Sequence, residues 1–427
     1  MSGLAPAGTD TQAGLPATID LQDRAVHSTR RYDIDWLRVL TIAGVFFFHN
    51  ARFFDPMPWH VKNPEKTVAA LVFVGLLDCF QMPLMMLVAG AGSWFALRSK
   101  TGGRYLWDRV LRLVIPLYTV GLLILIPPQY YWELVTNKGF AGSFWQSLPK
   151  FADTFNFSPS LGFLSFWPGH LWFLRDLFLI SLLTLPVLLV LRSKPGRWML
   201  ERLAAACDRP GGVFFFVIPL ALLQLATRMT WPGGHPLIQF FYLMTFFLIG
   251  YCLMASDRFT RTLQRHALAC LALGILCFLS MAYWVLGLGF NPWEMKRFSG
   301  IEAGFTILQS LNTWMWIAAF LGLAGRYLNF NNKVLAYANE AVLPFYALHQ
   351  TIILAIGWFV VPWPLGMATK YLIISSSSLL AIMAAYELLV RRLNFVRFLF
   401  GMRLISRRPA GVVQMGQGKE RCGHVGD

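Results

Sequence analysis

The chain has 427 residues, of which 56% are hydrophobic and only 14% are charged, and its mean hydropathy is +0.53. This composition excludes an ordinary soluble enzyme, because soluble domains carry about 25% charged residues. The net charge of +16 would suggest nucleic-acid binding in a soluble protein, but in a membrane protein the excess of Lys and Arg indicates basic cytoplasmic loops. The six cysteines show no paired spacing, so they predict neither a disulfide framework nor a zinc site.

The two ends of the chain differ from its apolar centre. Residues 1–30 are rich in Ala, Gly, Thr and Pro without any periodicity, and they lack the charged and apolar regions of a signal peptide. We therefore expect a disordered cytoplasmic tail at 1–30, a transmembrane domain over 31–392 and a basic cytoplasmic tail at 393–427.

Apolar runs close to 20 residues recur along the centre, and each is long enough to cross a bilayer. The predicted fold is all-α: a polytopic membrane protein of about ten transmembrane helices. They are expected at about 36–54, 68–97, 110–127, 171–191, 213–229, 237–255, 267–288, 304–325, 341–361 and 371–390. With the N-terminus inside, the cytoplasmic segments hold 25 Lys and Arg and the outer loops hold 7. This asymmetry predicts that both termini are cytoplasmic.

The first span carries ionisable residues at both ends of its apolar run. Arg38 and His49 are eleven positions apart, so an α-helix places them on nearly the same face, about 16 Å apart along its axis. Asp35 lies one turn before Arg38 and is expected to pair with it. Ionisable groups inside a membrane span are costly and indicate function, although His49 alone could be a structural histidine that bonds a neighbouring helix.

A second basic motif, WDRVLRLVIP, stands at the cytoplasmic entry to the third span. Arg109 and Arg112 are three positions apart and are expected on one face of an α-helix. Two guanidinium groups at a membrane mouth suit a phosphate, which they can hold through forked hydrogen bonds. The alternative is ordinary contact with lipid head groups at the membrane surface.

A long outer loop, residues 128–170, is expected between the third and fourth spans and is rich in Trp and Tyr. These aromatic residues predict either an interfacial belt or a platform for the sugar rings of an acceptor. Where the chain re-enters the membrane, His170 and Trp172 are candidates for the acceptor side of a site. Arg175 is expected to pair with Asp176 or to anchor the span.

The motif NEAVLPFYALHQ places His349 about 12 Å into the ninth predicted span, so His49 and His349 could meet near the middle of the membrane. A zinc site built from these two histidines is a weak alternative, because a catalytic zinc normally takes three protein ligands, and we expect no metal. The sequence has no Walker motif and no Gly-x-Ser-x-Gly elbow, which argues against an ATP-driven pump and a serine hydrolase.

Together these motifs resemble the acyltransferase-3 family of integral membrane acyltransferases. That family carries an arginine and a histidine with ten residues between them on its first span, a spacing that Arg38 and His49 match. It also carries an Arg-x-x-Arg before its third span, which Arg109 and Arg112 match. The segment Leu171–Leu174 is similar to its tryptophan motif. Leu343–Gln350 resembles the late histidine span of the branch that includes periplasmic glucan succinyltransferases. The second span departs from the family, with MMLVAGAGSW where Phe-Phe-x-x-Ser-Gly is frequent.

The resemblance implies transfer of an acyl group, such as acetyl or succinyl, from cytoplasmic acyl-CoA to a hydroxyl of an extracytoplasmic glycan or related acceptor. Acyl-CoA would be the donor substrate, with no tightly bound cofactor. Arg38, Arg109 and Arg112 would bind the CoA phosphates. His49 would deprotonate the acceptor hydroxyl, a role that suits a histidine of ordinary pKa near 6.5, or would carry the acyl group. His349 would orient His49 or stabilise the oxyanion.

The resemblance also implies a multi-pass protein of the bacterial inner membrane, whose partners are acyl-CoA, the glycan acceptor and lipid, and not nucleic acid. The alternative function is a proton-coupled transporter or exporter of a small organic or acylated molecule, because histidines buried in membrane spans also suit a proton relay. The acyl group, the acceptor and the order of covalent steps stay open at this stage.

Overall fold

The computed structural model describes residues 30–154, 168–230, 236–291 and 299–405. Within these ranges the regular structure consists of helices, without a strand. The chain divides into two compact units. Unit 1 comprises the chain up to Pro58, Lys62–Leu106 and Leu179–Val342, and unit 2 comprises Trp59–Val61, Trp107–Phe178 and the chain from Leu343.

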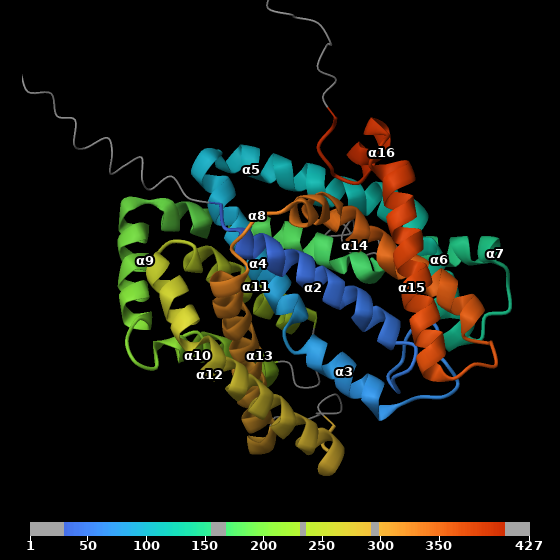
Figure 1. The fold of residues 1–427 in the computed structure, drawn as a ribbon, viewed down its shortest axis with the longest axis horizontal. Coiled ribbons are helices and arrows are strands. Elements are labelled where there is room, and N and C mark those ends of the chain that lie inside the picture. The colour runs from blue at the N-terminus through green and yellow to red at the C-terminus, as the bar shows by residue number, and fades with distance from the viewer. Residues whose placement is uncertain (1–29, 155–167, 231–235, 292–298, 406–427) are drawn as a thin grey trace, which may run out of the picture. The chain divides into compact units, whose positions relative to one another are not determined.

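The helices of unit 1 pack against one another (Figure 1). They are α2 (Tyr32–Ala51), α3 (Val68–Asp78), α4 (Gln81–Ser99), α9 (Lys194–Cys207), α10 (Val217–Thr230), α11 (Pro236–Leu253), α12 (Asp257–Ala282) and α13 (Gly300–Tyr327). Short 3-10 and π-helical turns, η5 (Gly212–Phe214) and η6 (Tyr283–Gly287), precede α10 and follow α12. The helices α12 and α13 lie side by side along most of their length (Figure 1).

Unit 2 contains helices from the middle and the end of the chain. They are η1 (Val110–Val114), η2 (Leu117–Leu125), α6 (Ile126–Lys138), α7 (Phe144–Ala152), η4 (Gly169–Leu171), α15 (Met367–Ala385), η7 (Tyr386–Val390) and α16 (Asn394–Leu399). Three further helices contain a boundary between the units: α5 (Gly102–Arg109), α8 (Trp172–Arg192) and α14 (Lys333–Val360).

Eight of the described helical segments are long and apolar enough to cross a membrane. They are Val68–Ser99, Gly102–Lys138, Gly169–Arg192, Gly212–Thr230, Asp257–Gly287, Gly300–Tyr327, Lys333–Val360 and Met367–Val390. Every one overlaps a span predicted from the sequence. The two other predicted spans fall on α2, which is not among the eight, and on α11, whose apolar part Leu237–Leu253 is shorter. The all-helical membrane fold is confirmed, while the count of ten and the orientation stay predictions.

The predicted third span and outer loop differ from the structure in their bounds. The third span is the middle of a continuous helical segment, Gly102–Lys138. Pro127 and Pro128 lie in the first turn of α6, which follows the π-helix η2 without a break. The helix ends at Gly139, whose φ of 63° is the left-handed conformation usual after a helix. The described part of the loop also contains α7, whose first turn has a Ser143–Gln146 capping box.

Paired glycines bring α4 and α11 into close contact in unit 1. A β-carbon at Gly90 would overlap the backbone carbonyl of Phe247, and one at Gly250 would overlap that of Leu87. Without a hydrophobic effect between helices in lipid, such close packing of small residues is a main source of helix association. Gly90 and Gly250 therefore allow the close contact between α4 and α11.

The C-terminal part of unit 2 is folded beyond the predicted start of the tail at 393. Arg397 of α16 is buried and donates to the backbone oxygens of Arg403 and Arg391. Gly401 has a φ of 66°, and a β-carbon there would lie 2.9 Å from the Cα of Arg112. The end of the described chain thus packs directly on the π-helical turn η1.

Candidate active site

The ion pair predicted at the start of α2 is present. Arg38 Nη2 donates to Asp35 Oδ1 at 2.7 Å and to Asn339 Oδ1 of α14 at 2.7 Å. Asp35 also accepts from Arg30, so the two guanidinium groups and one carboxylate retain one positive charge. This remaining positive charge, at the partly exposed side chain of Arg38, favours the binding of an anionic group.

His49 lies in the last turn of α2, and its side chain is half-buried. The helix is uninterrupted from Tyr32 to Ala51, which confirms that Arg38 and His49 belong to one helix, about 16 Å apart along its axis. The ring of His49 meets that of Phe48 edge to face, with centroids 5.2 Å apart. The imidazole is therefore oriented by an aromatic neighbour and still reachable.

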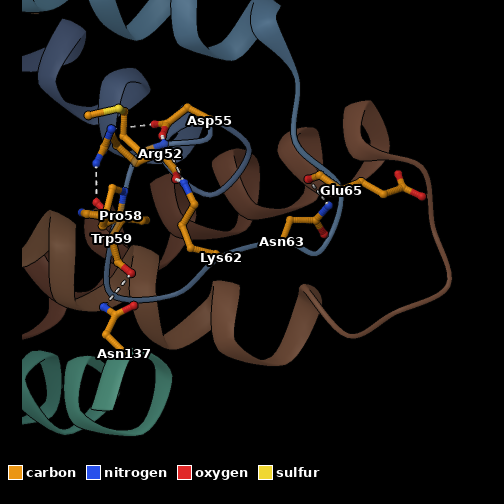
Figure 2. A network of polar contacts seen from close by, with 9 residues as sticks. Arg52, Asp55, Pro58, Trp59, Lys62, Asn63, Glu65 and Asn137 are labelled. Carbon is orange, nitrogen blue, oxygen red and sulfur yellow. Dashed lines mark hydrogen bonds and ion pairs between the residues drawn. The ribbon is translucent and has the colours of Figure 1, made fainter. Parts of the chain in front are cut away.

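A charged network follows His49 directly in the chain (Figure 2). Asp55 is completely buried and accepts from Arg52 at 2.7 Å, from the backbone N–H of Met57 at 2.7 Å and from Lys62 at 3.2 Å. The ammonium of Lys62 also donates to the backbone oxygen of Arg52. Burial lowers the pKa of Lys62 to about 8, and the carboxylate of Asp55 opposes this shift. The network ties the loop to the end of the helix that carries His49.

In unit 2 the structure brings His170 and His349 together. Their rings meet edge to face with centroids 5.1 Å apart, and both side chains are buried. His170 Nε2 lies 2.9 Å from the backbone oxygen of Ala347, and its Nδ1 lies 3.1 Å from Gln129 Nε2. Since a carbonyl only accepts, Nε2 of His170 carries the proton and Nδ1 accepts. Both ring nitrogens of His170 are thus occupied by the protein.

The tautomer of His349 is also defined by its surroundings. Its Nδ1 lies 2.6 Å from the backbone oxygen of Tyr346, so Nδ1 donates and the neutral ring has its lone pair on Nε2. The hydroxyl of Tyr346 donates to the backbone oxygen of His170 at 2.5 Å. His349 therefore has the form of a base, held by the same residues that hold His170.

The residue that joins these groups, Gln129, was not predicted. It is completely buried on α6, where its Nε2 donates to Thr351 Oγ1 at 2.8 Å and its Oε1 accepts from Gln350 at 3.2 Å. With His170 it links α6, η4 and α14. Nothing in the sequence distinguishes this glutamine except its place in an apolar segment after two prolines.

The two arginines of the Arg-x-x-Arg motif lie differently from the α-helical expectation. The residues Val110–Val114, which follow Arg109 and include Arg112, form a π-helix. Its turn is wider than that of an α-helix, so residues three positions apart no longer lie on one face. Arg109 is half-buried and Arg112 is exposed. Turns of π-helix are frequent at functional sites, so the Arg-x-x-Arg motif remains a candidate for substrate binding, although its geometry differs from the predicted one.

The remaining candidates are placed as follows. Arg175 Nε donates to Asp176 Oδ1 at 2.9 Å, which confirms that predicted pair. Trp172 is half-buried at the start of α8. His49 belongs to unit 1 and His349 to unit 2, and their meeting stays a prediction. Among the described residues there is no group of three or more His, Cys, Asp and Glu that could hold a metal ion.

The fold and these sites define a multi-pass helical membrane protein with polar chemistry inside its spans. Residues 31–387 match the acyltransferase-3 family model, described as an acyltransferase domain. The chain therefore belongs to this family and is a membrane acyltransferase, which confirms the resemblance seen in the sequence.

Curated relatives are similar over most of the chain. Glucans biosynthesis protein C of Salmonella schwarzengrund (strain CVM19633) is 22% identical over 362 residues, covering 79% of this chain and 86% of the relative. The protein of the same name from Salmonella heidelberg (strain SL476) is 21% identical over the same shares. No solved structure matches.

Proposed function

We propose that this acyltransferase moves an acyl group, acetyl, succinyl or similar, from cytoplasmic acyl-CoA to a hydroxyl of an extracytoplasmic glycan or related acceptor. Family membership supports the transfer, and the relatives named for glucan biosynthesis favour a glycan acceptor. The protein would lie in a bacterial inner membrane with both termini cytoplasmic, as the distribution of Lys and Arg predicts.

The observation that carries this proposal is the single helix α2 with Arg38 near its start and His49 in its last turn. A CoA thioester has its phosphates and its reactive carbonyl at opposite ends of a long arm. A cation about 16 Å from an imidazole along one helix suits such a donor. Arg109 and Arg112 would supply further charge for the phosphates of the CoA.

In the direct mechanism, His49 accepts the proton of the acceptor hydroxyl as its oxygen attacks the thioester carbonyl. The new C–O bond forms, the C–S bond breaks, and the CoA thiolate takes up the proton that His49 accepted. In the covalent alternative the imidazole of His49 attacks the thioester carbonyl, the C–S bond breaks and CoA leaves as the thiolate. The acceptor hydroxyl then attacks the acyl-imidazole, the acyl C–N bond breaks as the new C–O bond forms, and the hydroxyl proton goes to the CoA thiolate.

The paired histidines of unit 2 would act in support. Because both ring nitrogens of His170 bond within the protein, we assign His170 to positioning His349 and not to direct contact with the acceptor. His349 would orient a catalytic group or, with its imidazole protonated, would stabilise the oxyanion. Trp172, half-buried at the start of α8, keeps its proposed place on the acceptor side.

The experiment that tests this function uses purified protein in lipid nanodiscs, which have no sealed interior. The protein is given radiolabelled acetyl-CoA or succinyl-CoA and a gluco-oligosaccharide. We expect label to appear in the oligosaccharide with release of free CoA. A proton-coupled transporter would make no such product in nanodiscs and would move label only across sealed vesicles, and that result would refute the proposal.

A further inference from the structure

Unit 1 contains a continuous cluster of polar side chains to which none of the predicted site residues belongs. We call it the Asn312 cluster, and its members are Cys79, Gln224, Arg228, Tyr242, Gln309 and Asn312. They come from α10, α11, α13 and the junction of α3 and α4. All of these elements belong to unit 1.

Neighbouring members connect the cluster from end to end. The thiol of Cys79 lies beside Asn312 and within electrostatic reach of Tyr242. The hydroxyl of Tyr242 lies beside Gln224 and within electrostatic reach of Arg228. Arg228 Nη2 in turn donates to Gln309 Oε1 at 3.3 Å. The cluster is therefore one polar region that crosses three helices.

Several of these groups lack hydrogen-bond partners among the described residues. Asn312 is completely buried, yet neither its amide oxygen nor its amide nitrogen has a nitrogen or oxygen partner, and its polar neighbour is the weakly bonding thiol of Cys79. The Nε of Arg228 also lacks a partner, whereas the hydroxyl of Tyr242 lies beside Thr313 and Gln224. By contrast, Thr306 and Ser310, also buried on α13, donate to backbone oxygens of their own helix.

Such groups are unusual enough to require a cause. A buried polar group left without a partner is costly, and within a membrane span polar groups that face the protein interior mark substrate pathways. Three unpartnered atoms on two residues of one cluster, the two amide atoms of Asn312 and the Nε of Arg228, point to a polar occupant. An amide that offers both a donor and an acceptor is suited to the hydroxyl groups of a sugar, which both donate and accept.

Position favours the same ligand. Asp78, next to Cys79, is within electrostatic reach of Arg52, three positions after His49. In the predicted topology the cluster lies in the extracytoplasmic halves of its spans, the side from which an external acceptor would enter.

We propose that the Asn312 cluster is the binding site for the hydroxyl groups of a carbohydrate acceptor. This inference rests on the proposed function, because it assigns the acceptor of that reaction to a particular place. It makes Asn312 and Tyr242 specificity-determining residues.

The first test measures binding without turnover. Wild-type protein and Asn312→Leu are placed in nanodiscs, since maltoside detergents would themselves present sugar, and their thermal unfolding is followed with a gluco-oligosaccharide. We expect the oligosaccharide to raise the unfolding temperature of the wild type and of the matched control Ser310→Ala, but not that of Asn312→Leu. Without sugar, Asn312→Leu should be at least as stable as the wild type, because it replaces unpartnered polar atoms by apolar ones of similar shape.

The second test measures transfer. In Asn312→Leu we expect the KM for the oligosaccharide to rise on the order of tenfold or more, as loss of one or two hydrogen bonds requires, with the KM for acyl-CoA unchanged. Equal binding and transfer by Asn312→Leu and wild type would overturn the site and leave the proposed function standing. Lower stability of Asn312→Leu without sugar would also overturn it, since that indicates a structural amide. Sugar binding that needs Asn312, with no transfer by any form, would retain the site and refute the function.

Discussion

Gln129 shows how a single neutral side chain can define the chemistry of its neighbours. It joins Thr351, Gln350 and His170, and its own side chain is completely buried. Inside a protein each hydrogen bond matters more than at the surface, and a partly satisfied network is costly. The orientation of His170, whose Nδ1 lies beside this amide, therefore depends on Gln129.

Replacing Gln129 by Leu should destabilise the protein. The change leaves buried partners on α14 and η4 without their hydrogen bonds, which we expect to cost about 2–4 kcal/mol. The measurement is thermal unfolding in nanodiscs, compared with the wild type. An unchanged unfolding temperature would show that these bonds do not hold η4 against α14.

Lys62 provides a prediction on pH. Its pKa is lowered to about 8 in the folded protein, whereas an unfolded lysine keeps a pKa near 10.4. Between these values the unfolded chain binds more protons, so the stability that Lys62 affects should rise as the pH rises from about 8 to about 10. The wild type should therefore gain stability relative to Lys62→Met over this interval.

The control for this prediction is the same comparison below about pH 7, where Lys62 is largely protonated in the folded and the unfolded protein alike. The stability difference between the wild type and Lys62→Met should be nearly constant there, as measured by thermal unfolding. If the difference also stayed constant between about pH 8 and about pH 10, the buried environment assigned to Lys62 would be wrong.

At the scale of helices, the sequence predicted the existence of elements better than their bounds. Hydrophobic runs located every membrane helix that the structure describes, because crossing a bilayer demands a long apolar segment. They did not show the break at Cys79 between α3 and α4, nor the π-helical turn beside Arg112. Those features depend on local backbone hydrogen bonding and on packing against neighbours such as Gly401, which hydropathy does not record.

The glycine contacts between α4 and α11 give a prediction at this scale. Gly250→Ala places a methyl group on the backbone carbonyl of Leu87, which forces the helices apart and should cost about 2–3 kcal/mol. Gly92→Ala on α4 is the matched control, because nothing lies within 4 Å of a β-carbon there, and it should be neutral or slightly stabilising. Thermal unfolding of both variants measures the effect, and equal unfolding temperatures would contradict close packing at Gly250.

For the whole molecule, the sequence identified the class, the family and residues that could carry chemistry, since charges inside apolar spans stand out. It did not identify the contact between His170 and His349, because the two lie far apart in the chain and meet only through the fold. Nor did it point to Asn312 or Tyr242, which lie among apolar residues of their helices. The interest of Asn312 comes from its missing hydrogen-bond partners and that of Tyr242 from its place in the same cluster, which only coordinates reveal.

The most direct measurement of the central claim is acyl transfer by His49→Ala in nanodiscs with labelled acyl-CoA and a gluco-oligosaccharide. If His49 is the base or the acyl carrier, transfer should fall by at least about a hundredfold, while the unfolding temperature and the KM for acyl-CoA stay close to those of the wild type. Transfer by His49→Ala at the rate of the wild type would contradict the account.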